Sequence, residues 1–194
     1  MIRVLDIFFS FAGLLLLSPL FLALAIAIKL ESKGNVFYRQ MRVGKDDKDF
    51  WIYKFRSMRT DSDKNGLLTV GDDDPRITKV GRFIRKYKLD EFAQLLNVLI
   101  GDMSLVGPRP EVRKYVNLYN AEQRKVLSVK PGITDYASIE YHNENKILAQ
   151  STNPEKTYIE VVMPHKLQLN MKYINNPSLK NYFKIIALTL LGIF

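Results

Sequence analysis

The chain contains an uncharged stretch of 22 residues, from Ile7 to Ile28, which constrains its fold more than any other feature. Only Ser10, Gly13, Ser18 and Pro19 interrupt the apolar side chains of this run. At about 1.5 Å per residue, a helix of this length matches the roughly 30 Å hydrocarbon thickness of a bilayer. Buried helices of soluble proteins are rarely apolar for so long, so the sequence predicts that this segment contacts a membrane.

The topology of this segment has two solutions. A cleaved signal peptide is not favoured, because Arg3 stands beside Asp6 and no disulfide-forming cysteine follows. Proline removes a backbone donor and kinks a helix, and Ser18-Pro19 lies at the middle of the run. A helix kinked at this point can enter one leaflet and return, so that both of its ends are cytoplasmic. Many spanning helices tolerate a proline, however, and the residues alone do not decide between the two topologies. The basic residues that follow place that flank in the cytoplasm: Lys29, Lys33, Arg39, Arg42 and Lys45.

The charge balance narrows the class of partner. Lys and Arg number 29 against 20 Asp and Glu, which gives a net charge of +9 and indicates a polyanion: nucleic acid, an anionic bilayer or a phosphorylated substrate. No RNA-binding motif or recognition helix accompanies this charge, so we do not expect nucleic acid. The absence of cysteine excludes disulfides and thiolate chemistry, and only two histidines, His142 and His165, argue against a His-rich metal site.

The remaining residues are expected to form one α+β body. Runs 35–43 and 50–56 alternate as strands do, and the polar segment between them predicts a β-hairpin. Alternation places Lys54 and Arg56 on one face, opposite Trp51, Tyr53 and Phe55, and two cations there either meet a phosphate or face solvent. Amphipathic helices are expected over 78–88, 89–100 and 111–129, and from Pro154 with a break at Pro164.

No section has the features of a second globular domain. We therefore divide the chain into a membrane-embedded helix, 1–30, and one cytoplasmic or interfacial domain, 31–194. The final apolar run, 182–194, is too short to span and is expected to dock on the N-terminal segment or lie at the membrane interface.

The loop before Pro75 carries Asp72, Asp73 and Asp74, which either attract a cation or belong to an ordinary surface loop.

The stretch from Leu89 onward carries the candidate chemistry. A helix ending at Gly101 would hold Asp90 and Glu91 in its first turn, where carboxylates also simply complement the helix dipole. A functional alternative is that one carboxylate attacks a phosphoryl group as a nucleophile. Arg109 is held between Pro108 and Pro110, and its guanidinium matches the oxygens of a phosphate. The residues do not say which carboxylate has which role.

At this point the chain resembles the bacterial sugar transferases, the small monotopic polyprenyl-phosphate phosphoglycosyl transferases, over nearly its whole length. The matching residues occur in order along the chain: Ser18-Pro19, Arg39-Gln40-x-Arg42-x-Gly44, Tyr53-Lys54-Phe55-Arg56-Ser57-Met58, Asp74-Pro75-Arg76-Ile77-Thr78, Leu89-Asp90-Glu91, the segment from Gly101 to Pro110, and Pro131-Gly132-Ile133-Thr134.

The resemblance implies an enzyme that transfers a sugar-1-phosphate from a UDP-sugar to undecaprenyl phosphate and releases UMP, by a Mg²⁺-dependent ping-pong reaction. It implies that Asp90 is the nucleophile and lies close to the metal, that Glu91 is its partner, and that Lys54 is important for catalysis. Substrate binding would fall to Arg56, Pro108, Arg109 and His142. It also implies a re-entrant N-terminal helix at the cytoplasmic face of the bacterial inner membrane, with membrane lipids and other glycan-assembly enzymes as partners.

Four features depart from the family pattern: Phe92-Ala93 replaces Leu-Pro, Asp135 replaces a glycine, His142 replaces an arginine and Asn170 replaces an aspartate. The alternative hypotheses are a membrane-anchored protein that binds polyanions without catalysis, and an inactive relative that serves as a glycan-assembly scaffold. The hypothesis of an inactive relative stays open because Asn170 replaces an aspartate of the family pattern.

Overall fold

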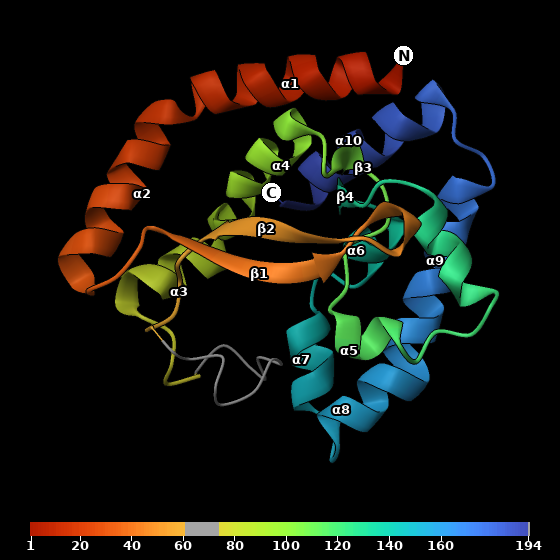
Figure 1. The fold of residues 1–194 in the computed structure, drawn as a ribbon. Helices are drawn as coiled ribbons and strands as arrows, with labels where there is room; N and C mark the ends of the chain where they lie inside the picture. The colour runs from red at the N-terminus through yellow and green to blue at the C-terminus, as the bar shows by residue number, and fades with distance from the viewer. Residues whose placement is uncertain (61–73, 194) are drawn as a thin grey trace.

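The computed structural model describes residues 1–60 and 74–193, and Figure 1 shows them as a single α+β arrangement. This confirms the predicted fold class. The division of the chain at residue 30 stays a prediction. Asp72 and Asp73 of the predicted aspartate loop lie outside the described residues.

The N-terminal apolar run forms two helices, α1 (Ile2–Leu16) and α2 (Ser18–Glu31), which meet at a bend of 60°. The bend lies at the predicted Ser18-Pro19 break: Pro19 is in the first turn of α2, and the Ser18 hydroxyl donates to the Leu15 carbonyl at 2.8 Å. Within the described residues, no single helix has the length and apolar composition needed to cross a membrane. The bent pair α1–α2 meets both requirements only when its two helices are taken together.

Polar side chains on α1 attach it to the rest of the molecule. Asp6 is only 2% exposed, and its carboxylate accepts three hydrogen bonds. The donors are the hydroxyl of Ser104 (3.0 Å), the backbone amide of Leu105 (3.0 Å) and the hydroxyl of Tyr182 (2.8 Å). Arg3 donates to the carbonyls of Val98 and Leu99 at the end of α4 (Leu95–Ile100), where cations complement the helix dipole. The first turns of α1 are therefore held on the same body as the rest of the chain.

We expect Asp6→Ala to lower the free energy of unfolding by about 2–4 kcal/mol, because it leaves buried donors without an acceptor. Thermal unfolding in detergent measures the effect. Phe8→Ala, on the same helix but 63% exposed, is the control and should change little. Equal stability of the two variants would show that the Asp6 contacts do not anchor α1.

Two small sheets form the centre of the molecule. β1 (Phe37–Val43) and β2 (Asp49–Phe55) make the predicted antiparallel hairpin, closed by the short 3₁₀ turn η1 (Lys45–Asp47). Tyr53 and Phe55 pack against α2, whereas Trp51 is half exposed. β3 (Ser104–Val106) pairs in parallel with β4 (Gly132–Thr134), which brings the segment after α4 beside the predicted Pro131-Gly132 turn.

Short helices surround the sheets. They are α3 (Lys79–Lys86), η3 (Leu89–Gln94), α5 (Arg113–Val116), η4 (Gln123–Ser128), α6 (Tyr136–Glu140), α7 (Glu144–Ala149), α8 (Pro154–Thr157), the π-helical turn η5 (Tyr158–Val162) and α9 (Met163–Ile174). The predicted helix over 111–129 is wrong. Asn120 and Gln123 cap each other through reciprocal side-chain to backbone hydrogen bonds of 2.9 Å, so a new turn starts there.

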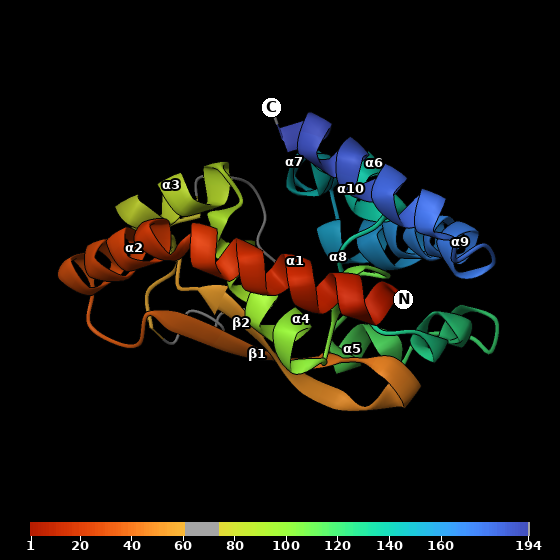
Figure 2. The same cartoon turned by 90° about the horizontal axis from the view of Figure 1, so that it is seen from above.

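The last helix, α10 (Leu179–Ile193), packs on α1, which is the first of the two alternatives expected for the C-terminal run. Besides the Tyr182–Asp6 hydrogen bond, Phe183 meets Phe9 edge to face with ring centroids 6.3 Å apart. The predicted break at Pro164 is confirmed as the π-helical turn that runs into the first residues of α9. Seen from above, α1, α2 and α10 are uncovered by other elements (Figure 2).

Candidate active site

Asp90 and Glu91 lie in η3, between α3 and α4. The sequence predicts the first turn of an α-helix here, and the structure corrects this to a 3₁₀ helix that begins after Lys88, whose φ of 52° is left-handed. At about three residues per turn, neighbouring side chains point some 120° apart, so the two carboxylates face different partners. The α-helix proper starts at Leu95 and ends at Gly101 in a left-handed conformation (φ 105°), where the sequence predicts its end.

Glu91 is engaged by Arg109. The two side chains form a bidentate pair, in which Arg109 Nη1 donates to Glu91 Oε2 at 2.9 Å and Nη2 donates to Oε1. Burial alone would raise the pKa of Glu91, but the Arg109 guanidinium, supported by Lys54, outweighs burial and lowers this pKa to about 2. Glu91 therefore stays ionised and oriented at any physiological pH.

Asp90, by contrast, accepts no hydrogen bond from the described residues and forms no ion pair with them within 4 Å. Its half-buried position raises the pKa of its carboxyl group, although the nearby Lys54 ammonium opposes this rise. Burial also lowers the pKa of Lys54, and the charge of Glu91 partly offsets this. The structure thus separates the two carboxylates: one is held by an arginine, and the other has free oxygen atoms beside a lysine.

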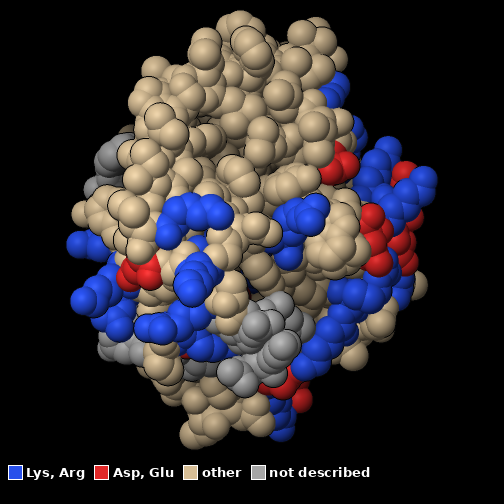
Figure 3. All heavy atoms as spheres, turned by 60° about the vertical axis from the view of Figure 1, so that its left-hand side comes forward, with Lys and Arg blue, Asp and Glu red and all other residues tan. Residues whose placement is uncertain are grey.

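These groups line a groove of about 1780 Å³ that also receives cationic side chains from β1, α3 and the segment after β2. Besides Lys54 and Arg109, the cations in its lining are Arg39, Arg42, Arg56, Arg59, Arg76, Arg82, Arg85, Lys86, Lys88, Lys146 and Lys166. Figure 3 shows lysine and arginine side chains gathered on this side of the molecule, below an upper part that carries almost no charge. The groove therefore favours an anionic ligand.

The loop that carries Arg109 is held at several points. The Arg109 amide donates to Asp135 Oδ2 at 3.0 Å, and the other oxygen of Asp135 caps α6 at the amide of Ser138. On the other side, Arg42 donates to the Pro110 carbonyl at 3.1 Å and pairs with Glu111 at 3.2 Å. In the sequence, Asp135 stands out only as a departure from the family pattern, and Arg42 only as a basic residue after the apolar run and as part of a motif. The only sign in the sequence of a fixed loop at this point is the pair of prolines, Pro108 and Pro110, on either side of Arg109.

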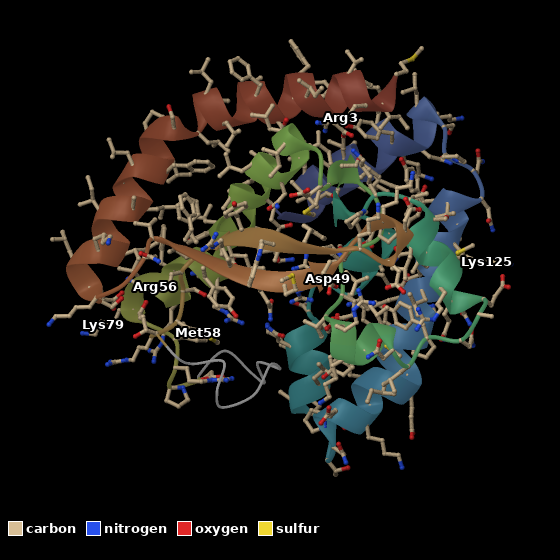
Figure 4. The ribbon with its side chains drawn as sticks, viewed as in Figure 1. Arg3, Asp49, Arg56, Met58, Lys79 and Lys125 are labelled. Carbon is tan, nitrogen blue, oxygen red and sulfur yellow. The ribbon has the colours of Figure 1, made fainter. Side chains whose placement is uncertain are left out.

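The three other predicted substrate-binding residues lie in different surroundings. Arg56 is 7% exposed and donates to the carbonyls of Ser32 (2.8 Å) and Lys33 (2.7 Å), just after the end of α2. Figure 4 shows Arg56 near this end of α2. Pro108 is buried behind Arg109, and its carbonyl accepts from the Gly132 amide at 3.0 Å. His142 is exposed at the groove. Substrate binding by these three residues stays a prediction.

Asn170, the departure on α9, is 5% exposed and lines the groove. Its Oδ1 has no hydrogen-bond partner among the described residues. An aspartate at this position would place a negative charge where Asn170 places a neutral acceptor.

The described residues contain no cluster of three or more His, Asp or Glu side chains placed to bind a metal ion. This donor set still fits Mg²⁺, which usually keeps several waters and is held by one or two carboxylates together with substrate phosphates. The free oxygens of Asp90 provide such a carboxylate, whereas those of Glu91 are occupied by Arg109.

The pH dependence of activity should reveal how the charge of Lys54 affects the ionisation of Asp90. If Asp90 is the nucleophile, as the resemblance implies, its carboxyl group must be ionised, so activity should fall as the pH drops through its pKa, which burial raises above the value of an ordinary aspartate. Replacing Lys54 by glutamine removes a cation that lowers this pKa, so the acid limb of the kcat/KM profile for the donor should move to higher pH. Lys45→Gln, an exposed lysine of the hairpin turn, is the control. An unmoved acid limb would show that Lys54 does not act on Asp90.

Comparison with known proteins identifies the family. The model of the bacterial sugar transferase family matches residues 1–194. The chain is 47% identical over 140 residues to the UDP-N-acetylgalactosamine-undecaprenyl-phosphate N-acetylgalactosaminephosphotransferase of Aeromonas hydrophila, covering 71% of this chain and 33% of that protein. It is 37% identical over 191 residues to the UDP-glucose:undecaprenyl-phosphate glucose-1-phosphate transferase of Escherichia coli (strain K12), covering 95% and 38%.

A shorter relative is the putative undecaprenyl-phosphate N-acetylgalactosaminyl 1-phosphate transferase of Bacillus subtilis (strain 168), 49% identical over 109 residues, which cover 56% of this chain and 61% of that protein. The matches thus span from a third to less than two thirds of these three relatives. Because the family model covers the whole chain and these three relatives are named as transferases, the chain belongs to the bacterial sugar transferase family.

Proposed function

We propose that this protein transfers a sugar-1-phosphate from a UDP-sugar to undecaprenyl phosphate, through a covalent phosphosugar intermediate on Asp90. The names of the relatives support the reaction class. The observation that carries the mechanism is the difference between the two carboxylates of η3. Glu91 is held by Arg109, whereas the Asp90 carboxylate accepts no hydrogen bond from the described residues and lines a cationic groove.

In the first step, an Asp90 oxygen attacks the phosphorus that carries the sugar. A bond forms between carboxylate and phosphorus, the bond from this phosphorus to the oxygen bridging to UMP breaks, and UMP leaves with the electron pair. Lys54 and Arg109 stabilise the negative charge that develops on the phosphoryl oxygens. When bound, Mg²⁺ would neutralise further phosphate charge beside Asp90.

In the second step, a phosphate oxygen of undecaprenyl phosphate attacks the same phosphorus. The bond to Asp90 breaks, its carboxylate is regenerated, and the product is an undecaprenyl-diphosphate-sugar. The attacking phosphate is already anionic at neutral pH, and Glu91, with a pKa near 2, is a weak base. We therefore assign Glu91 the role of orienting Arg109 rather than of accepting a proton.

We further propose that α1 and α2, bent by 60° at their junction, form a re-entrant helix at the cytoplasmic face of the inner membrane. The outward side chains of α1 are large and apolar, among them Phe8, Phe11 and Leu15, whereas Arg3 and Asp6 bond to the catalytic body. A spanning helix would carry these two residues to the far side of the bilayer and break their hydrogen bonds. A single-cysteine label near residue 2 should therefore react only from the cytoplasmic side.

The test of the function is UMP release from a panel of UDP-sugars, with undecaprenyl phosphate and Mg²⁺. We expect release with at least one donor and formation of the lipid-linked product. Folded protein that releases no UMP across a broad panel would overturn the proposal and favour the non-catalytic polyanion-binding or scaffold alternatives.

A further inference from the structure

The groove that contains Asp90 is also lined by apolar side chains that the proposed chemistry does not use, and we call this part of the groove the apolar arm. Side chains from four parts of the chain line this arm: the α1–α2 bend, the η3–α4 segment, β4 and the second half of α10. They include Leu17, Phe92, Leu95, Ile133, Ile186 and Leu190. Because Lys54, Asp90 and Arg109 line the same cavity, its charged and apolar parts are continuous.

The walls of the arm are held in place by contacts on both sides. On one side, α1 lies so close to α4 that a Cβ atom built on Gly13 would be 3.2 Å from Leu95 Cδ1, and Leu17 follows one turn later on the same face of the helix. On the other side, Thr189 of α10 and Thr134 of β4 form a hydrogen bond of 2.5 Å, and the Thr189 hydroxyl also bonds the Ile185 carbonyl at 2.8 Å. Because both threonine hydroxyls are already bonded within the protein, this part of the groove is poorly suited to hydrogen-bond the sugar or the base of a UDP-sugar.

The arm also lies beside the uncharged surface of the molecule. Leu16 at the end of α1 is 81% exposed, and Leu190 and Leu191 of α10 are 55% and 76% exposed. Large exposed apolar surfaces mark sites of membrane or ligand contact. A ligand in the whole groove would therefore meet cations and free carboxylate oxygens at one end and apolar side chains, continuing to an apolar surface, at the other.

The geometry points to the apolar arm as the binding site for the first isoprene units of the acceptor lipid, with the acceptor phosphate beside Lys54 and Asp90. This inference rests on the proposed function, which supplies an amphiphile with one phosphate and a long hydrocarbon chain. A UDP-sugar has no apolar part of this size, so the donor is assigned to the cationic part of the groove. Leu190 is then a specificity residue for the acceptor.

The test compares two leucines of α10 that are neighbours in sequence. Leu190→Glu places a charge in the arm, whereas Leu191→Glu places the same charge on the exposed surface outside the groove lining. Assays in detergent micelles containing undecaprenyl phosphate reduce the contribution of membrane binding. We expect Leu190→Glu to raise the KM for the acceptor at least about tenfold and Leu191→Glu to raise it less than about twofold. The UMP burst without acceptor should be unchanged in both variants.

A second measurement is independent of catalysis. Undecaprenyl phosphate with a diazirine in its first isoprene unit should, on irradiation, label peptides containing Phe92 or Leu190. Labelling confined to other segments would overturn the inference, as would equal acceptor KM values for the two variants or a rise in the donor KM alone in Leu190→Glu. If the wild-type protein shows no UMP burst, the proposed function fails, and the labelling pattern still decides whether the arm binds the lipid.

Discussion

Replacing Asp90 by asparagine should reduce turnover by a thousandfold or more (~10³), because the amide is a far poorer nucleophile toward phosphorus than the carboxylate. The protein should remain folded, since the Asp90 side chain accepts no hydrogen bond from the described residues. Its pKa is raised in the folded protein, so the ionised form costs stability at neutral pH, and this cost disappears as the pH falls through the raised pKa. Asp90→Asn should therefore be as stable as the wild-type protein or slightly more stable at pH 7.

Turnover in micelles and thermal unfolding, measured on the same preparation, check this result. Glu160→Gln, which changes an exposed carboxylate on the π-helical turn, is the matched control and should keep full activity. Normal turnover in Asp90→Asn would contradict the assignment of the nucleophile. A large loss of stability would show that Asp90 has a structural role that the contacts do not reveal.

Replacing Arg109 by methionine should have the second largest effect. It leaves Glu91 as an unpaired, partly buried carboxylate, and breaking one side of a buried pair typically costs 3–5 kcal/mol. Because the two side chains are 32% and 22% exposed, we expect a smaller loss of about 2–3 kcal/mol in the free energy of unfolding. Turnover should fall by roughly a hundredfold or more, since a cation facing the phosphoryl oxygens is lost.

A double variant separates these two effects. Adding Glu91→Gln to Arg109→Met removes the unpaired charge, so stability should recover in large part while activity stays low. Chemical denaturation and donor turnover would both be measured for the single and double variants. If stability failed to recover, the loss in Arg109→Met would come from packing of the Pro108–Pro110 loop and not from the Glu91 charge.

Features that depend on local chain chemistry were predictable from the sequence. Proline at position 19 removes a backbone donor and located the bend between α1 and α2. Strand alternation located the hairpin, and Gly101, with its positive φ, located the end of α4. In each case the residue type restricts the backbone within a few positions, whatever the rest of the fold does.

Features that depend on long-range contacts were not predictable. Glu91 and Arg109 are far apart in the sequence, and only the fold shows that the arginine expected to bind phosphate also locks one carboxylate. Strand alternation placed Arg56 beside Lys54, yet Arg56 lies just beyond β2 and turns to the carbonyls that end α2. Arg3 and Asp6 looked like a weakly charged N-terminus, whereas the structure places them against α4, β3 and α10.

The most direct test of the central claim is the mass of the protein after incubation with its UDP-sugar donor and Mg²⁺, in the absence of acceptor lipid. The account predicts a mass increase equal to one sugar phosphate, located on the peptide that contains Asp90 and lost on addition of undecaprenyl phosphate. An adduct on another residue, or a productive enzyme that never carries an adduct, would contradict it.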